Sequence, residues 1–70
     1  MKLTLSQWLG LRRMTQAELA EKAGVTRVSI NKYANGVTVP SEIYAQVVAN
    51  ALGIQPEEIE WDPEKLGELD

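Results

Sequence analysis

Three pairs of a hydroxyl residue and a glycine, with room for one short helix between the members of each pair, divide the middle of this 70-residue sequence. The pairs are Thr15 with Gly24, Thr26 with Gly36, and Ser41 with Gly53. A Ser or Thr side chain bonds a free amide at a helix N-terminus, and glycine adopts the left-handed conformation that ends many helices. The pattern predicts three short helices, the first of which begins at Gln16.

Further local signals determine how the first of these helices leads into the second. Thr15 and Glu18 form a capping-box sequence, in which each side chain bonds the backbone amide of the other residue. Val25 is spaced to pack on Ile30 as a hydrophobic staple. The helix after Ser41 carries a broad apolar face. The residues of this face are Tyr44, Ala45, Val48, Ala49 and Leu52.

The two ends of the sequence carry weaker signals. Apolar residues at helical spacing predict a helix near residues 5–13, while the alternation of residues 1–5 leaves a short extended arm as an alternative. Pro56 and the two glutamates after it predict a fifth helix, which buries Ile59. Trp61 is then either a lid on the small core or an exposed contact residue.

Together these elements predict an all-α fold, a compact bundle of five helices. A chain of this length forms one domain at most and buries only about 60% of the surface that its unfolded form exposes. We place the domain at residues 1–61. Residues 62–70 form an acidic tail, which is either flexible or a dimer contact.

Two absences from the sequence exclude several classes of function. The chain contains no cysteine and no histidine, so disulfides, thiolate metal clusters and the usual catalytic base are all missing. We expect neither an enzyme nor a bound metal, cofactor or small-molecule ligand. No apolar run approaches the roughly 20 residues that span a bilayer. We therefore expect a cytoplasmic protein without a membrane partner.

The net charge of −3 hides a strong asymmetry between the two parts of the chain. Residues 1–40 contain six basic and two acidic residues, a formal charge of +4. Residues 41–70 contain one basic and eight acidic residues, a formal charge of −7. A basic front with an acidic back indicates a polyanionic partner, although both parts could also be ordinary solvated surface.

The two capped helices between residues 16 and 35, joined by a tight turn at Gly24, form a helix-turn-helix pattern. With its flanking segments, the pattern resembles the Cro/C1-type (XRE-like) regulators, which have a lambda-repressor-like DNA-binding domain. The matching segments are 15–20, 24–26, 29–30, 35–36, 40–41 and 51–54. The resemblance covers roughly residues 5–60. It implies sequence-specific binding of double-stranded DNA, with the second motif helix in the major groove.

Four residues fall where the recognition helix of this family reads bases: Arg27, Val28, Asn31 and Lys32. Arg27 has the fork that bonds guanine O6 and N7, and the Asn31 amide matches an adenine edge. Val28 is able to contact a thymine methyl, and Lys32 to reach guanine or phosphate. The alternative for such a charged face is plain solvation, which an exposed Val28 beside Arg27 does not favour.

Five further residues are candidates for phosphate contacts. The resemblance assigns Gln16 to a phosphate clamp, and Thr26 and Asn35 to positions that often touch phosphate, although all three have structural readings as helix-end residues. Arg12 and Arg13 precede the motif and are able to reach the DNA backbone, unless Arg12 pairs with an acidic neighbour. Arg13 stands where the family often has glycine, so the end of the first helix is expected to differ.

The resemblance also implies partners. A homodimer, at least on DNA, would read a palindromic operator, as family members do with recognition helices about 34 Å apart. The candidate dimer contacts are Trp61, Leu66 and Leu69. We expect a small transcriptional regulator that acts as a repressor. The alternative is an interaction module, antitoxin-like or a phage regulatory protein, that uses the same fold to bind a protein.

Overall fold

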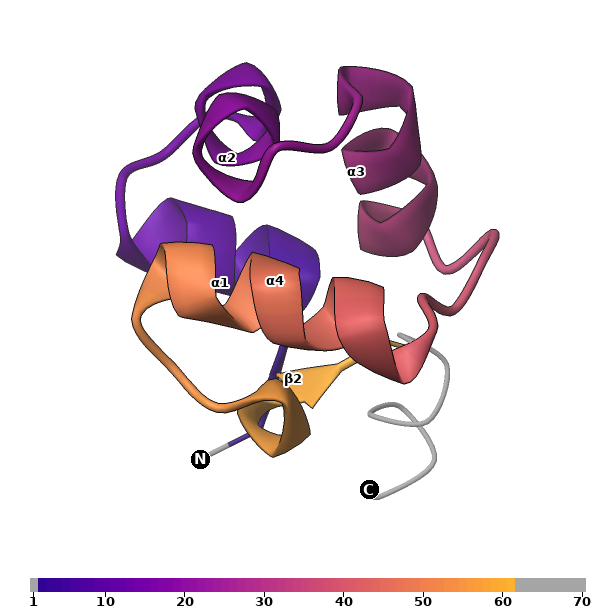
Figure 1. Cartoon of the computed structure of the whole chain (residues 1–70). Coiled ribbons are helices and arrows are strands. Elements are labelled where there is room, and N and C mark those ends of the chain that lie inside the picture. Colours follow the sequence, from indigo (N-terminus) through magenta and orange to yellow (C-terminus); the bar gives the residue numbers. More distant parts are fainter. Residues whose placement is uncertain (1, 62–70) are drawn as a thin grey trace.

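The helices predicted from the cap residues are present in the computed structural model, which describes residues 2–61. They are α1 (Leu5–Leu11), α2 (Gln16–Ala23), α3 (Arg27–Ala34) and α4 (Glu42–Leu52). Two short strands, β1 (Leu3–Thr4) and β2 (Ile59–Glu60), and one 3₁₀ turn, η1 (Pro56–Glu58), complete the described chain. Figure 1 shows the four helices arranged around a common centre, with β2 below α4.

The capping predictions for α2 and α3 are confirmed. The Thr15 hydroxyl accepts a hydrogen bond from the Glu18 amide at 3.1 Å, and Glu18 Oε1 accepts one from the Thr15 amide at 3.2 Å. The Thr26 hydroxyl accepts the Ser29 amide at 3.1 Å. Gly24 ends α2 with a φ of 73°, in the left-handed region that glycine adopts without steric cost.

The helix α4 has the predicted ends, but its exposed face differs from the prediction. Ser41 caps it by accepting the Tyr44 amide at 3.4 Å, and Gly53 ends it. Tyr44, expected on the buried face, is half exposed, while the other four residues of that face are buried. Tyr44 lies in the first turn of α4, next to the connection from α3, and lines a hollow beside Tyr33.

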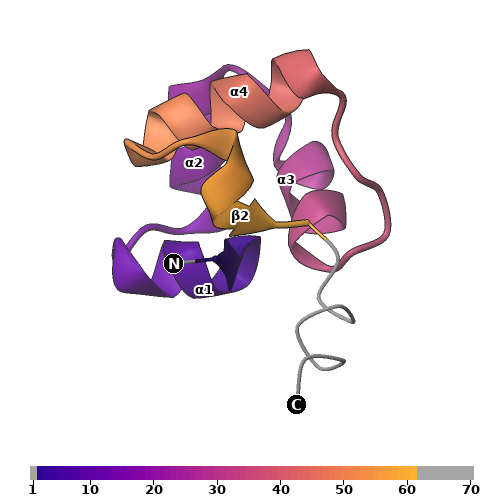
Figure 2. The ribbon, with the colours of Figure 1, turned by 90° about the horizontal axis from the view of Figure 1, so that it is seen from below.

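The predicted fifth helix is wrong, and with it the all-α bundle of five helices. Pro56 begins only the 3₁₀ turn η1, after which Ile59 pairs with Leu3 in parallel strands. The Trp8 indole N–H donates to the Glu58 carbonyl at 2.8 Å, so this carbonyl bonds α1 instead of a following turn of helix. The alternative of an extended arm is confirmed at Leu3 and Thr4. Figure 2 shows β2 beside the start of α1.

The core lies between the four helices and is closed by the strand pair. It is built from buried side chains of all four helices and of the segment after α4. These residues are Leu5, Trp8, Leu9, Leu19, Ala20, Ile30, Tyr33, Ala34, Val48, Ala49, Leu52, Ile54 and Ile59. Trp61 packs partly buried against this cluster. Within residues 2–61, no helix has both the length and the apolar character needed to cross a membrane.

Candidate nucleic-acid interface

The packing of α2 against α3 rests on small and apolar residues around a tight turn. Leu19 and Ile30 are fully buried at this crossing, and Ala20 leaves room for the close approach of the helices. Val25 packs partly buried against the same cluster, and its amide donates to the Ala20 carbonyl at 3.0 Å. This bond is part of the C-terminal cap of α2. The crossing therefore holds the N-terminal end of α2 beside the outer face of α3.

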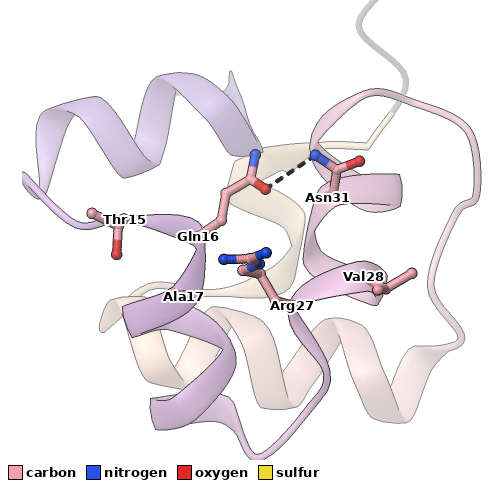
Figure 3. A pocket seen from close by; sticks show the side chains of 6 residues that line it. All are labelled: Thr15, Gln16, Ala17, Arg27, Val28 and Asn31. Atoms are coloured by element: carbon pink, nitrogen blue, oxygen red, sulfur yellow. Dashed lines mark hydrogen bonds between the residues drawn. The ribbon is translucent and has the colours of Figure 1, made fainter.

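A shallow hollow opens where the start of α2 meets the outer face of α3, as Figure 3 shows. Its lining residues come from these two helices and from the cap of α2. They are Thr15, Gln16, Ala17, Arg27, Val28 and Asn31. The hollow thus brings together one predicted phosphate-binding residue, Gln16, and three of the four predicted base-reading residues. Lys32, the fourth, is exposed on the same helix.

Three side-chain amides form a hydrogen-bonded chain across this surface. Asn31 Nδ2 donates to Gln16 Oε1 at 3.2 Å, and Asn35 Nδ2 donates to Asn31 Oδ1 at 3.2 Å. Gln16 Nε2 has no hydrogen-bond partner among residues 2–61, and Figure 3 shows it turned away from Asn31. The chain orients the Gln16 amide so that its N–H groups are free to donate to an external acceptor.

The cations of α3 are available to an external partner as well. Neither Arg27 nor Lys32 forms an ion pair with a residue of the described chain. Val28 lies between them in sequence with 64% of its surface exposed. Figure 3 shows the Arg27 guanidinium in front of the hollow, while the Val28 side chain points away from α2. This exposed face thus combines two free cations and one apolar side chain.

The remaining predicted phosphate-binding residues have local contacts of their own. The Thr26 hydroxyl caps α3 and also donates to Ser29 Oγ at 2.9 Å. The Arg12 guanidinium lies 5.5 Å from the centre of the Trp8 ring, a cation–π contact in place of the acidic partner considered for it. Neither Arg12 nor Arg13 lines the hollow. Both lie in the connection between α1 and α2.

Arg13 explains why α1 stops at Leu11, earlier than the expected residue 13. Arg13 has a φ of 52° and is the only residue other than glycine in the left-handed region among those described. Its amide donates to the Gly10 carbonyl at 3.2 Å. A left-handed residue cannot continue a right-handed helix. The conformation is the one that glycine adopts most easily, in agreement with the glycine that the resembling family often has here.

The sequence analysis did not predict the two hydrogen bonds that Asn31 forms on this surface. The spacing of Asn31 and Asn35, four residues apart on one helix, could have revealed their hydrogen bond. The bond from Asn31 to Gln16 has no such signal, because it joins two helices.

Trp61, a predicted dimer contact, meets Tyr33 edge-on with ring centres 6.0 Å apart, a geometry that favours the alternative in which Trp61 is a lid on the core. Leu66 and Leu69 lie outside the described residues.

Comparison with known proteins identifies the family of the chain. A family model described as helix-turn-helix, of the Cro/C1 type, matches residues 5–59, which is more than half of the chain. No curated protein and no solved structure matches. The matched residues include the whole of α1 to α4 and therefore every residue that lines the hollow. Among residues 2–61, no cluster of His, Cys, Asp and Glu has the arrangement of a metal site.

Proposed function

Because the chain belongs to the Cro/C1-type helix-turn-helix family of DNA-binding regulators, we propose that it recognises a specific double-stranded DNA sequence and acts as a repressor. The observation that carries the proposal is the exposed face of α3. Two cations without an ion-pair partner among residues 2–61 and an exposed valine stand there beside an oriented amide donor. In this proposal α3 enters the major groove, where base edges differ in their donors, acceptors and methyl groups.

The amide of Gln16 is proposed to hold the DNA backbone. Gln16 is the first residue of α2, where backbone amides and the helix dipole also favour an anion. Its free Nε2 hydrogens are able to donate to a phosphate oxygen beside these amides. Thr26 and Asn35, with Arg12 and Arg13 from the preceding connection, are proposed to add phosphate contacts. Such contacts fix the position of the protein on the duplex without reading its sequence.

Arg27 and Val28 are proposed to read bases, with Lys32 contributing to a base or a phosphate. Asn31 has a different proposed role. Its Nδ2 donates to Gln16 and its Oδ1 accepts from Asn35, so one hydrogen and one lone pair of the amide are already used within the protein. These two bonds, each worth about 1 kcal/mol, hold the Asn31 amide against Gln16. We therefore assign Asn31 to positioning Gln16, a refinement of the sequence prediction that it reads adenine.

The site of one protomer is small, and this favours binding in pairs. A homodimer on a palindromic operator gains affinity because the second contact forms at a high effective concentration. The recognition helices would then lie about 34 Å apart, one turn of the DNA helix. The second motif helix of each protomer would read one half-site.

Selection of bound fragments from random DNA tests the proposal most directly. We expect a palindromic consensus, and affinity that falls linearly with the logarithm of salt concentration. The variant R27A should then bind the selected sequence about 1–3 kcal/mol more weakly, a loss of roughly 5- to 150-fold. K22A is the matched control, because Lys22 is an exposed cation of α2 that does not line the hollow.

The outcomes separate the proposed function from its alternative. An equal loss for R27A on selected and random DNA would show that Arg27 contacts only the backbone. DNA binding without a salt dependence, or no binding, would favour the protein-interaction module. For the assignment of Asn31, N31A should weaken binding to all sequences alike, and Q16A should do the same. A change of preferred base at one position of the site would return Asn31 to the base-reading residues.

A further inference from the structure

An exposed apolar surface of the described chain lies beside the candidate interface. Among residues 2–61, six large hydrophobic side chains are exposed, and four of them fall between residues 37 and 44. These four are Val37, Val39, Ile43 and Tyr44, with 69%, 62%, 75% and 50% of their surface exposed. We call them the apolar patch. Single exposed hydrophobic residues need no explanation, but a group in one short segment indicates an interaction site.

The patch belongs to the connection between α3 and α4 and to the first turn of α4. Figures 1 and 2 show this connection at the outer edge of the molecule, after the C-terminal end of α3. In Figure 3 the same connection runs along the side of α3 that lies opposite α2. The patch therefore borders the face with the hollow, and a protein seated on it would stand next to DNA bound by α3.

The charges around the patch favour a second copy of this chain as its occupant. Residues 33–41, which include Val37 and Val39, carry no charge, whereas Glu42 directly precedes Ile43. In a two-fold contact each residue near the axis meets its own counterpart, so a charged centre would repel itself and a neutral one would not. The stretch that holds Val37 and Val39 is neutral and apolar, so the two-fold axis would pass through this stretch and not through Glu42. The alternative occupant within the chain, residues 62–70, carries four acidic side chains and one basic one, for which the patch offers no counter-ion.

The size of the patch indicates when such a contact forms. Four partly exposed side chains supply a surface of a few hundred Å². A stable interface buries about 800 Å² on each partner. The patch alone is too small to hold a dimer in free solution. Two protomers on adjacent half-sites of one DNA, however, meet at an effective concentration in the millimolar range, where a weak contact suffices.

We propose that the apolar patch is the contact between two copies of this chain when they occupy neighbouring half-sites, and that the free protein is monomeric. The proposal rests on the proposed DNA binding and goes beyond it by assigning the surface. It also moves the dimer contact away from Trp61, which packs against Tyr33 in the core. Because the patch borders α3, the contact would couple binding at one half-site to binding at the other.

Cysteine cross-linking tests the assignment, because the chain contains no cysteine of its own. The variants V37C, V39C and I43C are each treated with a short bismaleimide, on DNA with two half-sites, on DNA with one half-site, and without DNA. At least one variant should form a covalent dimer on the two-site DNA and remain monomeric in the other two samples. L11C is the matched control, since Leu11 is also an exposed apolar residue but ends α1. It should not cross-link on any DNA.

A second variant gives a thermodynamic readout. V39E places like charges across the two-fold contact, so it should lower the affinity for two-site DNA by about 10-fold or more beyond the loss that the added charge causes on single-site DNA. Val39 is exposed, and circular dichroism should therefore show an unchanged fold. Equal binding of V39E and the unchanged protein to two-site DNA would overturn the proposal.

The possible failures are distinguishable. If two protomers occupy the DNA without any cross-link from the patch variants, the proposed function stands and the patch assignment is wrong. If cross-linking appears only after removal of residues 62–70, this segment and not a second copy covers the patch. If the unchanged protein binds no DNA at all, the proposed function fails, and the contact that rests on it fails too.

Discussion

The substitution R13G separates a structural cost from a functional contribution at one residue. Arg13 holds a φ of 52° at the end of α1, and its side chain is exposed. A residue with a Cβ atom in this region costs about 1–2 kcal/mol. Glycine removes that strain but loses about 0.5–1 kcal/mol through the larger entropy of the unfolded chain. The net expectation is a gain of about 0.5–1 kcal/mol in the free energy of unfolding.

Urea unfolding followed by tryptophan fluorescence measures this gain, because Trp8 is buried in the core and Trp61 packs partly buried against it. In thermal unfolding, the expected Tm rise for a domain of this size is about 2–8 °C, since 1 kcal/mol corresponds to roughly 4–8 °C. If Arg13 contacts a phosphate, R13G should also bind DNA more weakly. The slope of log affinity against log salt should then fall in magnitude by about 0.9.

The variant R13Q is the control that keeps the two effects apart. Glutamine retains the Cβ atom and therefore the strain, but it lacks the charge. R13Q should match the unchanged protein in stability and match R13G in its salt slope. Equal stability of R13G and R13Q would refute the strain argument. An unchanged salt slope in both variants would remove Arg13 from the phosphate contacts.

Three further substitutions test the fold by chemical denaturation. G10A should raise the free energy of unfolding by about 0.5–1 kcal/mol, because Gly10 lies in α1 and an added Cβ meets no atom within 4 Å. A lower free energy of unfolding would show that the added Cβ does not fit there. T15A should lower it by about 1 kcal/mol, because the Glu18 amide loses the Thr15 hydroxyl as its acceptor; unchanged stability would show that water replaces this acceptor. I59A should lower the free energy of unfolding by about 2–5 kcal/mol, since Ile59 is 1% exposed. A loss below 1 kcal/mol would mean that the strand pair contributes little to the core.

The ends of the central helices follow from local sequence alone. The caps at Thr15 and Thr26 join residues three positions apart, and Gly24 ends α2 by its own backbone freedom. Such interactions form between neighbours in the chain and need no knowledge of the fold. The same local signals placed Gln16 and Arg27 at the starts of the two motif helices, where the structure has them.

Contacts between distant parts of the chain decided the rest. Pro56 carries a helix-start signal, but pairing of Ile59 with Leu3 and the bond from the Trp8 indole stabilise an extended segment instead. The orientation of the Gln16 amide likewise depends on Asn31, which only the crossing of α2 and α3 brings within reach. Local propensity is weak and each tertiary contact is comparable to it in energy, so several such contacts together override it. Sequence thus determined where the motif helices begin, and tertiary packing decided which side chains remain free to bind.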